Sequence, residues 1–208
     1  MSEENVSRRD LLKTIGSSMI LTTAGAGILP PVLAQHVHDA VMQIKSLDGG
    51  PNYEPKCLTR HEFATLRKLS DYIIPADDHS KGAIDGGAAE FIDFLCSRNT
   101  ELAQIYTGGL AWLDDAMMHH HQTTFLDAKP EHQTAMLDLI AYRKNESPAL
   151  GPGIHFFTWA RNMVVDAYYT SPVGIADLGY MGNNAMSTFS VPKEAIDYAI
   201  KRSPFANA

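Results

Sequence analysis

The stretch that decides the fold is LTRHEFATLRKLSDYIIP, residues 58–75. Thr59 is followed three residues later by Glu62, which is the spacing of a capping box at the start of a helix. Pro75 ends the run, because proline does not continue a helix. Between these limits the apolar side chains recur at helical spacing, at Phe63, Leu66, Leu69 and Ile73. The sequence therefore predicts an amphipathic helix over this stretch.

Similar helical spacing continues along the rest of the chain, and no stretch alternates apolar and polar residues long enough to predict a strand. We predict an all-α fold in residues 58–208, a small helical domain of about five to six helices. The further helices are expected near residues 87–96, 100–119, 154–169 and 193–201, and another is expected to begin at Pro130 and to bury Met136, Leu137 and Ile140.

Two segments do not fit this pattern. Residues 35–57 have little periodicity and several Gly and Pro breaks, so we predict an extended arm or linker. Residues 170–191 form a long Gly/Pro/aromatic loop near the C-terminus, which we expect to pack on its own helices or on another protein. The residues expected to contact a partner are Trp159, Tyr169, Pro172, Gly179, Tyr180 and Asn183.

The N-terminus, SRRDLLK at residues 7–13, resembles a twin-arginine export signal in which Arg8 and Arg9 are the defining pair. A weakly apolar run and small residues follow, which is the general order of a secretory leader. We predict that residues 1–34 are a signal peptide cleaved between Ala34 and Gln35, and that the chain is periplasmic. A retained membrane anchor is the alternative, although the run is short for a membrane span.

Composition excludes some classes of function. The net charge of −7 argues against nucleic acid, whose binding requires clustered Lys and Arg. The two cysteines, Cys57 and Cys96, are too few for a disulfide scaffold. In an oxidising compartment they form either a single disulfide or two buried free thiols.

Motifs of catalysis and cofactor binding are missing from the sequence. There is no dinucleotide-binding G-x-G-x-x-G after a strand, no G-x-S-x-G nucleophile elbow, no Walker loop and no C-x-x-C-H haem attachment. We therefore predict no catalytic residue and no cofactor in this chain.

The strongest local candidate for a metal site is the run His119, His120 and His121. Consecutive residues on a helix point about 100° apart, so at most one or two of these imidazoles can face one site. We interpret the run as a solvated helix end. For the pairs Asp77-Asp78 and Asp114-Asp115 we likewise favour a structural role over acid-base or metal chemistry.

Two motifs resemble a known family. The first is IIPADD, residues 73–78, with Gly-Ala after it, and the second is YYTSP…G…DLGY-x-GN, residues 168–183. Together with YTGGLAWLDD, residues 106–115, they are similar to the gluconate 2-dehydrogenase subunit 3 family, the small subunits of membrane-associated periplasmic flavin dehydrogenases. The resemblance covers most of residues 58–192.

The resemblance implies an accessory role. In such complexes a large subunit of the glucose-methanol-choline type holds FAD, and a multihaem cytochrome c subunit passes electrons to quinone. The small subunit binds the large one and supports its maturation and its export by the twin-arginine translocase. The alternative function is that of an independent periplasmic His-rich protein that binds a metal or another ligand.

Overall fold

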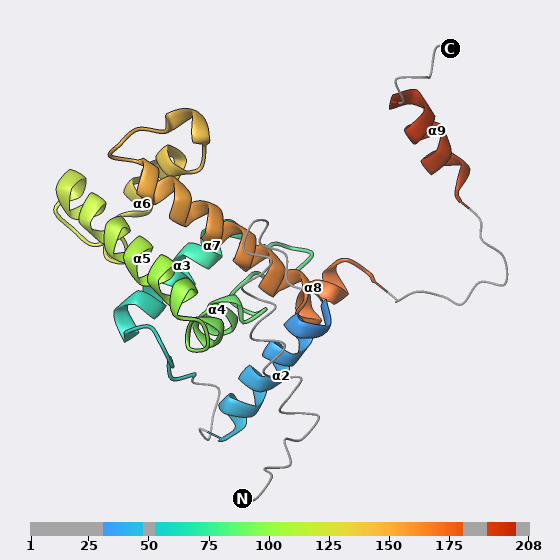
Figure 1. Cartoon of the computed structure of the whole chain (residues 1–208), viewed down its shortest axis with the longest axis horizontal. Coiled ribbons are helices and arrows are strands. Elements are labelled where there is room, and N and C mark those ends of the chain that lie inside the picture. The colour runs from blue at the N-terminus through green and yellow to red at the C-terminus, as the bar shows by residue number, and fades with distance from the viewer. Residues whose placement is uncertain (1–30, 48–52, 181–190, 203–208) are drawn as a thin grey trace, which may run out of the picture.

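The computed structural model describes residues 31–47, 53–180 and 191–202 (Figure 1). No strand occurs within these ranges, and helices make up most of them, which confirms the all-α prediction. The helices are α2 (Pro31–Leu47), α3 (Arg60–Ile73), α4 (Ala88–Cys96), α5 (Thr100–His121), α6 (Pro130–Ile140), the 3₁₀-helix η1 (Arg143–Asn145), α7 (Gly151–Tyr169), α8 (Pro172–Asp177) and α9 (Lys193–Arg202).

Helix α3 begins as the sequence predicts. The hydroxyl of Thr59 accepts the Glu62 N–H at 3.2 Å, and the Glu62 carboxylate accepts the Thr59 N–H at 2.8 Å, so both halves of the capping box are present. Leu66 and Leu69 are fully buried on the inner face of the helix. The predicted starts of α4, α5, α6 and α9 also agree with the structure to within a residue.

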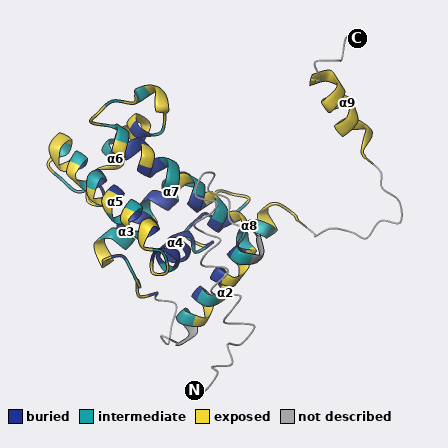
Figure 2. Cartoon of the chain, in the orientation of Figure 1, coloured by how far each residue is buried: buried dark blue, intermediate teal, exposed yellow. Residues whose placement is uncertain are grey.

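The core is built around α4, which packs against α2, α3, α5 and α7. Its nine residues are almost all buried, as the dark blue of Figure 2 shows. Helices α5 and α7 approach closely because a glycine on each faces a ring on the other. A Cβ atom at Gly109 would collide with the Phe156 ring, and one at Gly153 would collide with the Trp112 ring.

The buried carboxylate of Asp93, on α4, holds the segment that precedes α3. It accepts hydrogen bonds from the Tyr53 hydroxyl at 2.8 Å and from the backbone N–H groups of Lys56, Cys57 and Leu58 at 2.6, 3.1 and 2.8 Å. Asp93 is completely buried, so these four donors replace the water that a carboxylate would otherwise bind. The segment is thereby fixed on α4.

The prediction of an extended arm over residues 35–57 is wrong for its first half, which lies in α2. Ala34, Val37 and Val41 are buried at helical spacing, and α2 packs on α4. Lys45 extends from α2 to an ion pair with Glu90 at 3.0 Å. The apolar pattern of α2 crosses the predicted cleavage point. The sequence interpretation therefore places Ala34 in the signal peptide and Val37 in the arm, and the helical spacing between them does not show.

The predicted loop over residues 170–191 also needs correction, because its first part is the helix α8. The remainder from residue 181 to 190 lies outside the described residues. Helix α9 has no buried residue. No helix within the described ranges is long and apolar enough to cross a membrane.

Candidate functional site

Tyr168, near the end of α7, joins the two distinctive motifs of the sequence. Its hydroxyl donates a hydrogen bond to the backbone carbonyl of Lys81 at 2.5 Å. Its ring packs on Gly86, where a Cβ atom would lie only 2.9 Å from the ring. Tyr168 itself is fully buried. The loop that follows α3 and the end of α7 therefore form one packed unit.

The loop that begins with the IIPADD motif is held by its own backbone. Asp77 Oδ1 accepts the N–H groups of His79 and Ser80 at 2.8 and 2.7 Å, and these bonds lower the pKa of the Asp77 carboxyl. Gly82 lies so close to the start of the loop that a Cβ atom would be 2.7 Å from the Ile74 carbonyl oxygen. Asp77 is therefore used as a turn residue, as the sequence indicated.

The TSP part of the second motif ends α7 and starts α8. The Ser171 hydroxyl donates to the Tyr168 carbonyl at 2.6 Å and accepts the Gly174 N–H at 3.1 Å, so Ser171 is the N-cap, and Pro172 is the first residue of α8. A Cβ atom at Gly174 would collide with the Tyr168 carbonyl oxygen. The glycine thus permits the close approach of α8 to the end of α7.

The DLGY part of the second motif is the C-terminal cap of α8. The Tyr180 N–H donates to the Ile175 carbonyl at 3.2 Å, and the Gly179 N–H donates to the Ala176 carbonyl at 3.0 Å. Gly179 has a φ of 60°, a conformation that glycine adopts without strain. This bond pattern is a Schellman motif, and it fixes the direction in which Tyr180 leaves the helix.

Large apolar side chains remain exposed where α7 turns into α8. Tyr169 is 37% exposed, Leu178 61% and Tyr180 58%. We call this region the corner surface, defined by Tyr169, Pro172, Leu178, Gly179 and Tyr180. Because its backbone is held by caps and buried contacts, it presents apolar groups on a rigid support, which is typical of a protein-binding site.

Charged residues accompany the corner surface. Three exposed carboxylates lie in the adjoining loop, at Asp77, Asp78 and Asp85, and Lys81 is the exposed lysine among them. Helix α8 ends on exposed Asp177. The Asp177 carboxylate lies 3.5 Å from the Tyr168 hydroxyl, which places α8 beside the loop. The surroundings of the corner surface are therefore acidic.

Helix α2 supports the corner from behind. His38 Nε2 lies 3.0 Å from the Thr170 hydroxyl, and the His38 ring packs on Phe91 with centroids 4.7 Å apart. Burial lowers the pKa of His38. The sequence does not indicate this structural role of His38, because its contacts come from residues more than fifty positions away.

The sequence profile described as Gluconate 2-dehydrogenase subunit 3 matches residues 60–187, a range that includes both motifs that meet at Tyr168. The chain belongs to the gluconate 2-dehydrogenase subunit 3 family. No curated protein and no solved structure gives a significant match. The family match begins with α3, so α2 and α9 lie outside it.

The other residues predicted from the sequence are distributed over the chain. Trp159, a predicted contact residue, is half-buried and packs partly against the core of this family domain. Ala34, the predicted cleavage residue, is buried in α2. Arg8, Arg9 and Asn183 lie outside the described residues.

The histidine run lies on the last turn of α5, as expected for a helix end. His119 and His120 are exposed, whereas the His121 ring stacks on that of His132 from α6, with centroids 4.0 Å apart. Loss of water around the ring and the neighbouring His132 and His120 lower the pKa of His121. Within the described part of the chain, no three His, Cys, Asp or Glu side chains are grouped so as to hold a metal.

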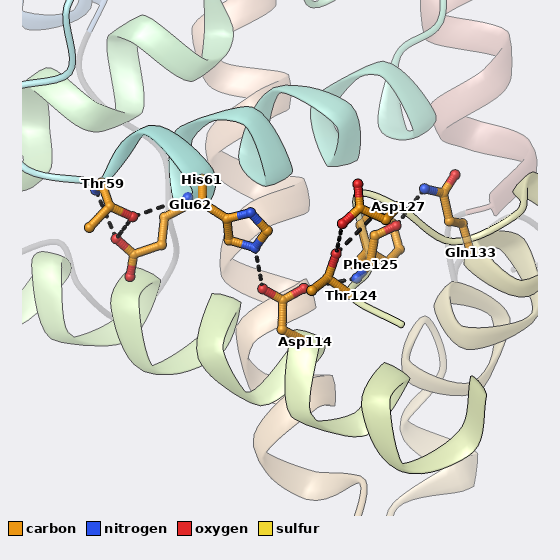
Figure 3. Close-up of polar contacts among 8 residues, drawn as sticks. All are labelled: Thr59, His61, Glu62, Asp114, Thr124, Phe125, Asp127 and Gln133. Carbon is orange, nitrogen blue, oxygen red and sulfur yellow. Dashed lines mark hydrogen bonds and ion pairs between the residues drawn. The ribbon is translucent and has the colours of Figure 1, made fainter. Parts of the chain in front are cut away.

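Asp114 has a structural role that the sequence also indicated. Its Oδ2 lies 2.6 Å from His61 Nε2, and its Oδ1 accepts the Phe125 N–H at 2.8 Å (Figure 3). The Phe125 carbonyl in turn accepts from Gln133 Nε2 at 2.5 Å. These bonds join α3, α5 and the segment before α6, whereas Asp115 is exposed.

Proposed function

We propose that the chain is the non-catalytic small subunit of a membrane-associated periplasmic dehydrogenase complex. It binds the FAD-containing large subunit, which is of the glucose-methanol-choline type and holds the substrate. A multihaem cytochrome c subunit is the expected electron acceptor of the complex. Membership of the gluconate 2-dehydrogenase subunit 3 family supports an assignment to a multisubunit dehydrogenase.

The single observation that supports a docking role is the corner surface. Tyr169, Leu178 and Tyr180 are exposed although their backbone is firmly held. Aromatic side chains on rigid elements lose little conformational entropy on binding and dominate many interfaces. We therefore place the contact with the large subunit at this surface.

The acidic surroundings of the corner surface suggest the charge of the partner. Asp77, Asp78 and Asp177 would be matched by Lys or Arg on the large subunit. Exposed charges of this kind mainly accelerate association, and salt screens them. Added salt is expected to slow association more than it accelerates dissociation.

The leader supports a second part of the proposal, which is export. A twin-arginine signal carries folded proteins, so one signal on this chain can deliver a complex that already contains FAD. The small subunit then acts as an escort for the maturation and export of the large one. This escort role requires that the large subunit has no export signal of its own.

The docking proposal is tested by co-expressing the chain with the proposed large subunit, a flavoprotein of the glucose-methanol-choline type from the same organism. Tyr180→Ala is expected to leave the circular dichroism spectrum unchanged and to lower co-purification by at least about tenfold, as for a central interface residue. Tyr142→Ala is the matched control, because Tyr142 is 55% exposed and lies between α6 and η1, outside the corner surface. Equal co-purification of both variants would exclude the corner surface.

The escort proposal is tested separately by changing Arg8 and Arg9 to Lys. The flavoprotein and its FAD-dependent activity are then expected to remain in the cytoplasm, although the two subunits still co-purify. A periplasmic, active flavoprotein in this double variant would contradict the escort role. The docking test would not be affected by that outcome.

A further inference from the structure

We propose that Cys57 and Cys96 are the site of an intramolecular disulfide bond that ties the start of the α3 segment to the end of α4. They are the only two cysteines of the chain, and both are free thiols in the structure. The inference concerns this domain alone and goes beyond the proposed role in a complex.

The carboxylate of Asp93 places Cys57 beside the turn of α4 that carries Cys96. Asp93 Oδ1 accepts the N–H groups of Cys57 and of Leu58, the next residue, at 3.1 and 2.8 Å. Cys96 follows Asp93 by three residues in the same helix, so the side chains of Asp93 and Cys96 lie on the same side of α4. A disulfide joins Cα atoms roughly 4.4–6.8 Å apart, which is on the scale of one helical turn.

Both thiols lie in or against the hydrophobic core. Cys96 belongs to the hydrophobic core and is 3% exposed, and Cys57 is half-buried and packs against the same core. Burial raises the pKa of Cys96, and the nearby Cys57 raises it further. Burial and, to a smaller extent, the charge of Asp93 raise the pKa of Cys57. Both groups are therefore thiols at neutral pH, and oxidation is expected to accelerate as the pH rises.

The different exposures set the order of the reaction with a small disulfide such as oxidised glutathione. The Cys57 thiolate attacks one glutathione sulfur, forms a mixed disulfide and releases one glutathione. The Cys96 thiol then loses its proton and attacks the Cys57 sulfur, which releases the second glutathione. Overall, two protein thiols are oxidised to one disulfide while one oxidised glutathione is reduced to two thiols.

The experiment uses the purified full chain, reduced and then incubated in a glutathione redox buffer. Free thiols are blocked with N-ethylmaleimide, and the intact mass is measured. We expect a product that has lost two hydrogen atoms, carries no maleimide and yields a peptide pair linked through Cys57 and Cys96. A folded chain that keeps two free thiols, or that keeps glutathione on Cys57, would overturn the proposal.

Two variants distinguish this route from random oxidation. Cys96→Ser is expected to accumulate a stable glutathione adduct on Cys57, because the second thiol is missing. Cys57→Ser is expected to remain unmodified while folded, because Cys96 is buried. Modification of Cys96 in folded Cys57→Ser at the rate seen in denaturant would contradict the proposed order.

Oxidation is also expected to raise Tm by roughly 5–15 °C, since the bond closes a loop of about 40 residues in the unfolded chain. The double variant Cys57→Ser/Cys96→Ser is the control and should show the same Tm in reducing and oxidising buffer. A wild-type Tm that is unchanged or lower after the bond has formed would show that the folded geometry does not accommodate it.

Discussion

The hydroxyl of Tyr168 donates a hydrogen bond to the backbone carbonyl of Lys81, and this contact joins two segments that are 87 residues apart. Tyr168 belongs to the motif at the end of α7, and Lys81 belongs to the loop after α3. The corner surface, which we propose as the docking site, rests on this connection. Stability of the corner is therefore the first property to test.

Tyr168→Phe is expected to lower the free energy of unfolding by about 1–2 kcal/mol, because the carbonyl of Lys81 loses its buried partner while the ring remains. Urea unfolding followed by circular dichroism measures the change. Tyr142→Phe removes the hydroxyl of an exposed tyrosine and should have almost no effect. Equal stability of the two variants would show that the bond to Lys81 contributes little.

The adjacent glycines of α5 are expected to respond in opposite directions to alanine. Gly109→Ala forces a methyl group into the Phe156 ring and should destabilise the fold by about 1–3 kcal/mol. At Gly108 the added Cβ would meet no atom within 4 Å apart from its chain neighbours and the backbone of its own helix, so Gly108→Ala should stabilise the helix by about 0.5–1 kcal/mol. Thermal unfolding of both variants measures this. A stable Gly109→Ala variant would mean that α5 and α7 are more loosely packed.

Asp93→Asn is expected to destabilise the fold by about 3 kcal/mol or more. The carboxylate accepts four hydrogen bonds in a fully buried position, whereas an amide presents N–H groups to two of the same donors. Asp115→Asn, at an exposed position of α5, is the control. Chemical unfolding at neutral pH compares them, and a loss below about 0.5 kcal/mol for Asp93→Asn would contradict the role of this residue.

We expect the free energy of unfolding to decrease as the pH is lowered, because of His38. Burial lowers its pKa in the folded state below the ordinary 6.5, against the weaker opposite effects of the Ala167 backbone and Asp39. The unfolded chain therefore binds a proton more readily, and stability present above pH 6.5 is lost as the pH falls through the folded pKa. Unfolding measured between about pH 7.5 and pH 5 tests this window.

The variants for this measurement are His38→Gln and His155→Gln. The first removes the buried titrating group and should flatten the dependence of the unfolding free energy on pH. The second removes an exposed histidine of α7 and should leave the dependence as in the wild type. The same slope in the wild type and in His38→Gln would assign the effect to other groups.

Much of the fold could be predicted because its signals are local. The capping box of Thr59 and Glu62, the proline at the start of α6 and the apolar spacing of α5 and α7 depend on residues within a few turns of one another. The same holds for the structural role of Asp77, which caps the turn that follows it. The family resemblance, confirmed over residues 60–187, also depends on contiguous motifs.

Two elements were mistaken because their signals are short or cross an expected boundary. Helix α8 has only six residues, and its pattern of Ser, Pro and two glycines resembles that of a loop. Its helical form depends on the N-cap at Ser171 and on the space that Gly174 leaves beside Tyr168. Helix α2 has a narrow apolar face, which is recognisable only once α4 is present to cover it.

The sequence by itself determined the helical class, most helix boundaries and the family, because hydrophobic periodicity and capping act between near neighbours. Only the tertiary structure decided that the Tyr168 hydroxyl meets the Lys81 carbonyl and that the Asp93 carboxylate accepts four hydrogen bonds. It also decided that Tyr180 is exposed, whereas Trp159 packs partly on the core. These facts depend on contacts between residues far apart in the chain. Such contacts are set by how whole helices pack, and a local pattern does not encode them.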